Sequence, residues 1–348
     1  MPESYPRAPF PWFGGKSRVA DVVWERFGDV RNYVEPFFGS GAVLLGRPGG
    51  AQGTETVNDL DGFVANFWRA VALSPAETWE WADSPVNEAD LHARHVWLIQ
   101  QMDDGFTDRL MGDPDFHDAK IAGWWVWGLC AWIGSGWCSG GGPWWPDADG
   151  KLANGNAGRG VNRKMPHLGN AGQGVNRQMP HLGDAGQGVN RQMPHLGNAG
   201  RGGPMADLAE RMRHVRVACG DWGRVLGDSV TSRHGTTAVF LDPPYSDEAG
   251  HQISYRTTSG TVAHDVRDWA LANGDNPLLR IALCGYAGEG HDVLVSLGWT
   301  AHGWKAKGGY GSQGDGAGRA NAARETVWFS PHCLDAAHSQ PELFAVRP

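Results

Sequence analysis

Short apolar runs near the start of the chain are bounded by glycine or acidic residues, as in a buried sheet. Residues 31–36 are typical of a short buried strand that ends in an acid, and a glycine turn at 39–41 leads to an apolar helix start. Residues 54–58 read as a second strand, and apolar residues at helical spacing follow over 63–73. This strand–helix–strand–helix order predicts a parallel sheet with crossover helices.

The pattern changes in the middle of the chain and returns later. Residues 75–136 are predicted to be mainly helical, whereas 134–203 are rich in Gly, Asn and Pro and show neither a helical nor a strand period. Alternation then resumes with a strand at 237–242, a helix at 262–272, and strands at 279–284 and 325–330. We therefore expect one α/β domain interrupted by an inserted segment.

The inserted segment contains a repeat with a period of 14 residues. The run from Gly155 to Leu168 recurs from Gly169 and Gly183, and a fourth copy that starts at Gly197 decays after Gly202. Each full copy carries one Val-Asn-Arg and one Met-Pro-His-Leu. Three glycines per copy make it a poor helix former, so ordered loops or an extended arm are expected rather than a packed solenoid.

Charge is distributed unevenly along the chain. The formal net charge is -8, which by itself argues against a polyanionic partner. Between Lys151 and Arg216, however, there are ten Lys or Arg and only three acids. The net charge of this segment is therefore about +7, and that of the rest of the chain is about -15. A localised basic segment on an acidic protein is typical of a nucleic-acid contact.

Several other features limit the possible classes of protein. The five cysteines are scattered without a Cys-x-x-Cys pair, which favours buried thiols over disulfides or a zinc site, and no metal is expected. No apolar run is long enough for a membrane span and no signal peptide is evident, so the expected location is cytoplasmic. The tryptophans between 124 and 145 could stack on bases, but they are interpreted mainly as core of the insert.

Two glycine-containing motifs resemble nucleotide-binding loops without satisfying their rules. Gly15-Lys16-Ser17 would need a further glycine at position 10 to form a phosphate-binding P-loop, and that residue is Phe10. The run from Glu35 to Gly41 would need a glycine at Leu44 for a dinucleotide fingerprint. What remains is an acid at a strand tip followed by glycines, which suits a cationic ligand with an amino-acid head group better than a pyrophosphate.

The third motif, Asp242-Pro243-Pro244-Tyr245, directly follows an apolar strand. Two prolines stiffen the backbone and remove two amide donors, so the Asp242 carboxylate and the Pro243 carbonyl are acceptors near a rigid corner. Tyr245 offers a flat face for stacking. Such a site suits a planar heterocycle with an exocyclic amino group.

Together these motifs resemble the Dam-type family of DNA adenine N6-methyltransferases in the alpha arrangement, in which the recognition module precedes the Asp-Pro-Pro-Tyr motif. The resemblance covers about 1–73 and 217–330. It implies a Rossmann-like methyltransferase sheet with helices on both faces, interrupted by a mainly helical insert that also holds the Gly-rich repeats. It also divides the chain into a catalytic domain (1–73 and 217–335), an inserted target-recognition module (74–216, with repeats at 155–202) and a tail (336–348).

The family resemblance implies specific roles and partners. S-adenosylmethionine is the implied cofactor and double-stranded DNA the implied partner. Asp242, Pro243, Pro244 and Tyr245 would form the catalytic pocket for a flipped-out adenine. The residues implied to hold the cofactor are Trp12, Lys16, Glu35, Phe37, Gly39, Asp59 and the pair Asp221-Trp222, where Trp replaces the family's Phe.

Three points stay open on the sequence alone. Arg163, Arg177 and Arg191 recur with the repeat, either as phosphate contacts or in a solvated linker. Methylation of an amino group in RNA or in a protein amide is an alternative activity, and an inactive DNA-binding relative is another. The target sequence and any restriction endonuclease partner are not determined.

Overall fold

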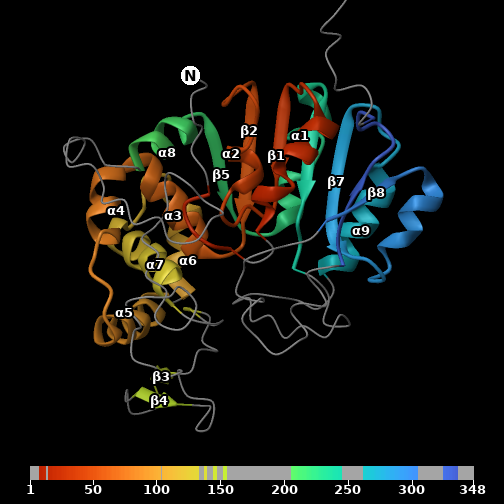
Figure 1. The fold of residues 1–348 in the computed structure, drawn as a ribbon. Coiled ribbons are helices and arrows are strands. Elements are labelled where there is room, and N and C mark those ends of the chain that lie inside the picture. Colours follow the sequence, from red (N-terminus) through yellow and green to blue (C-terminus); the bar gives the residue numbers. More distant parts are fainter. Residues whose placement is uncertain are drawn as a thin grey trace, which may run out of the picture.

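The computed structural model is built on a seven-stranded sheet (Figure 1). The strand order is β5-β2-β1-β6-β7-β9-β8, and all neighbours are parallel except β9, which is antiparallel to both β7 and β8. The strands are β1 (Asn32–Glu35), β2 (Thr54–Asp59), β5 (Val215–Cys219), β6 (Thr237–Leu241), β7 (Leu279–Tyr286), β8 (Thr300–Gly303) and β9 (Glu325–Phe329). The residues that the structure describes are 8–12, 15–102, 104–132, 137–138, 144–146, 152–154, 205–244, 262–304 and 324–335.

Apolar side chains alternate between the two faces of the central strands. Tyr33 of β1 and Phe240 of β6 join the core on one face, whereas Val34 and Leu241 join the core on the other. A strand that is apolar on both faces requires cover on both sides. The first face packs against α1 (Ala20–Phe27), α2 (Ala42–Leu45) and α3 (Gly62–Leu73), and the second against α9 (Val262–Asn273) and the 3-10 helix η6 (His291–Leu297).

The segment after α3 is helical, as expected. It forms α4 (Pro75–Ala82), α5 (Glu88–Gln101), α6 (Asp104–Gly112) and α7 (Ala119–Ala131), and α8 (Met205–Met212) leads back to β5. Trp125 of α7 stacks on Phe63 of α3, with ring centroids 6.1 Å apart. Trp125, Trp127, Trp132 and Trp137 are all buried, which confirms that these tryptophans serve mainly as core. The helical part of the insert therefore shares a core with the first face of the sheet.

One expectation for the insert is wrong. No strand was expected over 134–203, yet β3 (Trp144–Pro146) and β4 (Leu152–Asn154) pair as an antiparallel hairpin. Strands of three residues are too short to show a period of two in the sequence. The 14-residue repeats lie outside the described residues.

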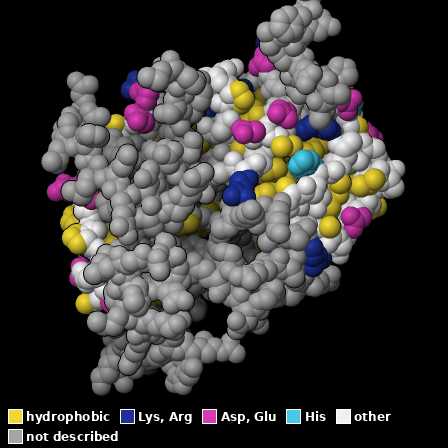
Figure 2. Space-filling view, in the orientation of Figure 1, with side chains coloured by type: hydrophobic (Ala, Val, Ile, Leu, Met, Phe, Trp, Pro, Cys, Tyr) yellow, Lys and Arg dark blue, Asp and Glu magenta, His cyan; other side chains and the backbone are white. Residues whose placement is uncertain are grey.

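The surface is mixed in character where it is described. On the face shown in Figure 2, acidic, basic and apolar side chains are interspersed around the sheet. All five cysteines are buried thiols, as predicted. Within the described residues, no helix is both long enough and apolar enough to cross a membrane.

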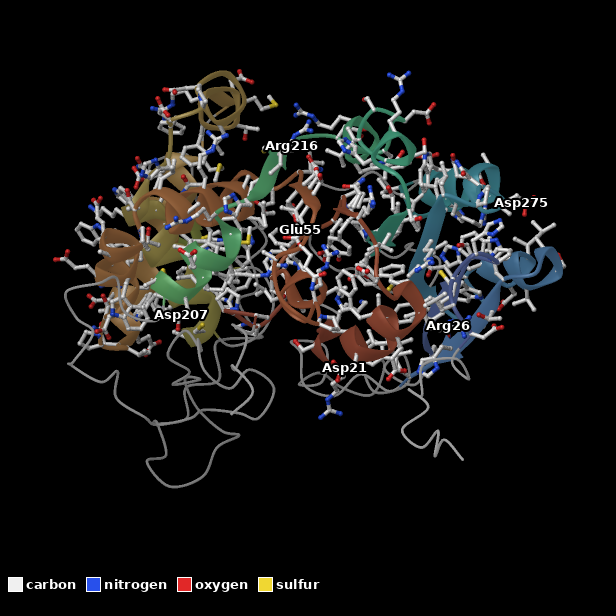
Figure 3. The ribbon with its side chains drawn as sticks, turned by 90° about the horizontal axis from the view of Figure 1, so that it is seen from above. Asp21, Arg26, Glu55, Asp207, Arg216 and Asp275 are labelled. Carbon is white, nitrogen blue, oxygen red and sulfur yellow. The ribbon has the colours of Figure 1, made fainter. Side chains whose placement is uncertain are left out.

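A buried ion cluster fixes the amino-terminal edge of the sheet, which Figure 3 shows from above with Glu55 labelled. Arg47 donates to Glu55 Oε1 (2.9 Å), and Arg211 of α8 donates to both carboxylate oxygens (2.6 and 2.9 Å). All three side chains are at most 4% exposed, so pairing is required to offset their desolvation. The cluster anchors α8 to β2 at the edge opposite to the candidate site.

Candidate active site

The sequence-predicted site residues converge at the carboxyl ends of the parallel strands. Glu35 ends β1, Asp59 ends β2, and Asp242 directly follows β6. Strand β1 lies between β2 and β6. The connection that leaves β1 runs toward β2, whereas the connection that leaves β6 runs toward β7, in the opposite direction. Such a switch point is where open α/β sheets bind ligands, because the loops diverge there and leave a crevice.

One amide side chain ties three of the strand ends together. Asn58 Nδ2 donates to the Pro36 carbonyl (3.1 Å) and to the Gly220 carbonyl (2.9 Å), while the backbone carbonyl of Asn58 accepts from Phe38 N (2.9 Å). Asn58 is 1% exposed. It fixes the loops after β1 and β5 relative to β2, and the sequence reasoning did not single it out.

The glycine turn after β1 brings Trp12 and Asp59 to the same point. Gly39 has a φ of +46°, a conformation that favours glycine, and a Cβ at this position would collide with the Trp12 indole. The Gly39 amide donates to Asp59 Oδ2 (2.9 Å), and the Asp61 amide donates to Asp59 Oδ1 (2.9 Å). Burial raises the pKa of Asp59 to about 7, although both amide hydrogen bonds act in the opposite direction.

Two further predicted residues meet beside the loop after β1. The rings of Phe37 and Trp222 are stacked, with centroids 6.2 Å apart and planes inclined by 27°. Trp222 opens the 3-10 helix η3 (Trp222–Val225), which Asp221 caps by accepting from Gly223 N (2.9 Å). The Trp222 ring therefore forms an aromatic surface together with Phe37, next to the loop after β1.

Lys16 lies against the first residue of the Asp-Pro-Pro motif. It sits in the 3-10 helix η1 (Lys16–Arg18), and its Nζ is 2.9 Å from Asp242 Oδ1 and 3.8 Å from Glu325 Oε2. Burial alone would lower the pKa of the Lys16 ammonium, but Asp242 and Glu325 outweigh this effect and hold it above its usual value. The resemblance associates Lys16 with the cofactor, and the structure places it in contact with Asp242, the carboxylate that the resemblance implies for catalysis.

Glu35 is another buried carboxyl group, and it lies near Asp242 and Asp59. Its Oε2 accepts a hydrogen bond from the Tyr33 hydroxyl (2.7 Å), and its side chain is almost fully buried. Burial raises the pKa of Glu35 well above its usual value, and the nearby negative charges of Asp242 and Asp59 add to the rise. A cation bound beside Glu35 would favour its ionised form.

The remaining predicted residues are only partly described. Pro243 is buried and Pro244 is partly exposed directly after Asp242. Tyr245 and the repeat arginines Arg163, Arg177 and Arg191 lie outside the described residues. Within the described part of the chain, no three His, Cys, Asp or Glu side chains are grouped to hold a metal.

Besides Asn58, two residues at the site were missed by the sequence reasoning. Glu325 begins a strand that was expected, but only its antiparallel direction brings this first residue to the carboxyl edge. Trp304, whose ring centroid lies 5.9 Å from Lys16 Nζ, follows β8 and covers the ammonium. No spacing pattern in the sequence marks either residue.

Comparison with known proteins supports the family resemblance predicted from the motifs. Residues 12–94 match the family described as D12 class N6 adenine-specific DNA methyltransferase. The match spans Trp12, Lys16, Glu35 and Asp59 and reaches into α5. No curated protein matches the chain. Residues 12–94 are therefore similar to the D12 class N6 adenine-specific DNA methyltransferases, a family of enzymes.

Proposed function

We propose that this protein transfers a methyl group from S-adenosylmethionine to N6 of an adenine flipped out of double-stranded DNA. The observation that carries the proposal is the position of Asp242. It follows β6 at the switch point of the sheet, 2.9 Å from the buried Lys16 ammonium. The ends of β1 and β2, with Glu35 and Asp59, lie at the same edge of the sheet.

The residues on the β1–β2–β5 side fit the proposed cofactor. Gly39 allows close approach of a ligand to the backbone, where a side chain would collide with Trp12. Asp59 offers carboxylate oxygens at the end of β2, where ribose hydroxyls are bound in related folds. Glu35 supplies negative charge for an ammonium group, and the stacked Phe37 and Trp222 offer a surface for an adenine ring. When bound, S-adenosylmethionine supplies an electrophilic methyl group on a sulfonium.

The residues after β6 fit the adenine. A base within a duplex is out of reach, so it must be flipped into the pocket at a cost of a few kcal/mol. Asp242 and the Pro243 carbonyl would accept the two N6 hydrogens, which localises the nitrogen lone pair and makes N6 a better nucleophile. The Asp242 carboxylate also stabilises positive charge that grows on N6. Stacking on Tyr245 would offset about 1–3 kcal/mol of the flipping cost.

The insert is the part of the chain proposed to hold the DNA. Residues 74–216 would form the target-recognition module, and the repeat arginines within it would contact phosphates. Phosphate contacts position a protein on the duplex without specifying sequence, so this role is separate from base recognition.

The test is sequencing that reports N6-methyladenine in DNA from cells that express the chain. We expect methylated adenines at a defined sequence with the natural chain and none with Asp242→Ala. Calorimetry should show that Asp242→Ala still binds S-adenosylmethionine, because the carboxylate acts mainly on the target amine. Retained binding also shows that the variant is folded.

Two results would contradict the proposal. Near-normal DNA methylation by Asp242→Ala would remove Asp242 from the chemistry. Unmodified DNA combined with methyl transfer to RNA or protein would move the activity to another amino group.

A further inference from the structure

The carboxyl edge of the sheet carries a further acid, Glu325, that the motifs named in the sequence analysis do not include. Strand β9 runs antiparallel to β7, and Glu325 pairs in register with Tyr286, the last residue of β7. The first residue of β9 therefore lies at the same edge as the last residues of β6 and β7. This reversal of direction is what places the Glu325 carboxylate 3.8 Å from Lys16 Nζ.

The cluster around Lys16 is shielded from water. The Lys16 and Glu325 side chains are 5% and 4% exposed, and Asp242 is 17% exposed. The Trp304 ring lies over Lys16, and the Trp304 amide donates to the Glu325 carbonyl (3.0 Å). Charges in such a setting are weakly screened, so each one changes the field at its neighbours strongly.

The charge balance gives Glu325 a consequence for the reaction. Lys16 and Asp242 alone form a formally neutral pair, in which the ammonium withdraws the negative charge that the target amine requires. With Glu325 on the same ammonium, the three groups carry one net negative charge. Positive charge grows on the adenine amine during methyl transfer, so a net negative cluster beside it favours the transition state.

We propose that Glu325 is a positioning residue for methyl transfer, which shares the Lys16 ammonium with Asp242 and so keeps the Asp242 carboxylate electron-rich toward the adenine amine. This role rests on the proposed function. It assigns no contact between Glu325 and substrate or cofactor, because Glu325 acts through Lys16.

The test compares the full-length chain with Glu325→Gln, which keeps the size of the side chain and removes its charge. We expect the single-turnover rate of DNA methylation to fall about tenfold, the equivalent of one pKa unit of charge stabilisation. Affinities for S-adenosylmethionine and DNA should change by less than about twofold, since Glu325 acts in the transition state. Glu325→Asp should recover part of the rate.

The pH dependence supplies a readout that a purely structural role would not change. Lys16 faces Asp242, Glu325, the buried Cys284 thiol and Tyr286, and burial raises the pKa of both Cys284 and Tyr286. Removal of one of the two carboxylates should lower the pKa of Lys16. Nuclear magnetic resonance of the Lys16 side-chain nitrogen should therefore show that Lys16 loses its proton at lower pH in Glu325→Gln than in the natural chain.

Glu289→Gln is the matched control. Glu289 is also buried at this end of β7, but its carboxylate accepts from Tyr286 N (3.0 Å) and lies 3.8 Å from His291 Nε2. An equal loss of rate in Glu289→Gln, or an unchanged Lys16 titration in Glu325→Gln, would overturn the role of Glu325. A natural chain that methylates no DNA would instead overturn the proposed function, while the Lys16 titration would still decide whether Glu325 supports the charge on Lys16.

Discussion

Carboxyl groups held away from water are the main feature of the site at the scale of single residues. Glu35 and Asp59 sit at neighbouring strand ends, and burial raises the pKa of both. A raised pKa means that the folded protein holds a proton that the unfolded chain would release. For Asp59 this stabilises the fold at low pH, and the contribution is lost as the pH rises toward about 7. A bound cation or hydroxyl donor would offset the cost of ionising these buried carboxyl groups.

Cofactor affinity should therefore depend on pH through Asp59. We expect S-adenosylmethionine binding to tighten as the pH rises through about 7, because the ionised carboxylate is the stronger acceptor for hydroxyl groups. Calorimetry between about pH 5.5 and 7.5 measures this dependence. Asp59→Asn should bind more weakly and lose the tightening near pH 7, whereas Glu35→Gln should keep it. Equal pH dependence in Asp59→Asn and the natural chain would exclude Asp59 as the titrating group.

At the scale of helices and strands, polar side chains fix how elements meet at both edges of the sheet. Asn58 joins the loops after β1 and β5 at the carboxyl edge, and Glu55 joins α8 to β2 at the amino edge. The strands themselves were predictable where they are apolar on both faces, as for β1, β6 and β7. The short β8, which is exposed along its length, has no such pattern, so propensity alone could not find it.

The ion cluster at the amino edge predicts unequal effects of two nearby arginines. Arg211→Ala should lower the free energy of unfolding by about 3–5 kcal/mol, because it removes one partner of a buried carboxylate. Arg213, just past the end of α8, pairs with Glu210 at the surface, where both side chains are more than 60% exposed. Arg213→Ala should cost less than about 1 kcal/mol. Urea denaturation checks both values, and equal losses would show that the buried cluster contributes no more than a surface pair.

At the scale of the whole molecule, the residues proposed for catalysis and the segment with the largest positive charge lie in different parts of the sequence. The described residues that we propose for catalysis lie at one edge of the sheet, and the net negative charge of the chain argues against general attraction to DNA. The local excess of about +7 between Lys151 and Arg216 is the main candidate for electrostatic contact with phosphates.

Replacement of Arg163, Arg177 and Arg191 with Ala together tests this role of the repeats. Each neutralised phosphate adds about -0.9 to the slope of log affinity against log salt, so the slope should flatten by roughly 2–3 units. The matched control replaces Arg18, Arg31 and Arg233, which are exposed and lie outside this basic segment, and should leave the slope unchanged. DNA titrations at several salt concentrations measure both. An unchanged slope in the repeat variant would indicate a linker, and a changed target sequence would indicate base recognition.

The sequence by itself indicated the family resemblance and most of the sheet. Asp242-Pro243-Pro244-Tyr245, the glycine turn and Asp59 are local patterns, because their function depends on residue type at the end of a strand. The family match over residues 12–94 confirms the resemblance for the part of the chain that holds the glycine turn and Asp59. Buried central strands were also evident, since both of their faces must be apolar.

Only the tertiary structure decided which distant residues act on one another. More than two hundred positions separate Lys16 from Asp242, and about eighty separate Asp242 from Glu325. No local pattern links the three residues, although they are in contact in the structure. The direction of β9 brings Glu325 to the site, and Asn58 joins three strand ends through hydrogen bonds that depend on strand order. Direction and order follow from how the whole sheet buries its two faces, and that is a property of the complete chain rather than of any one segment.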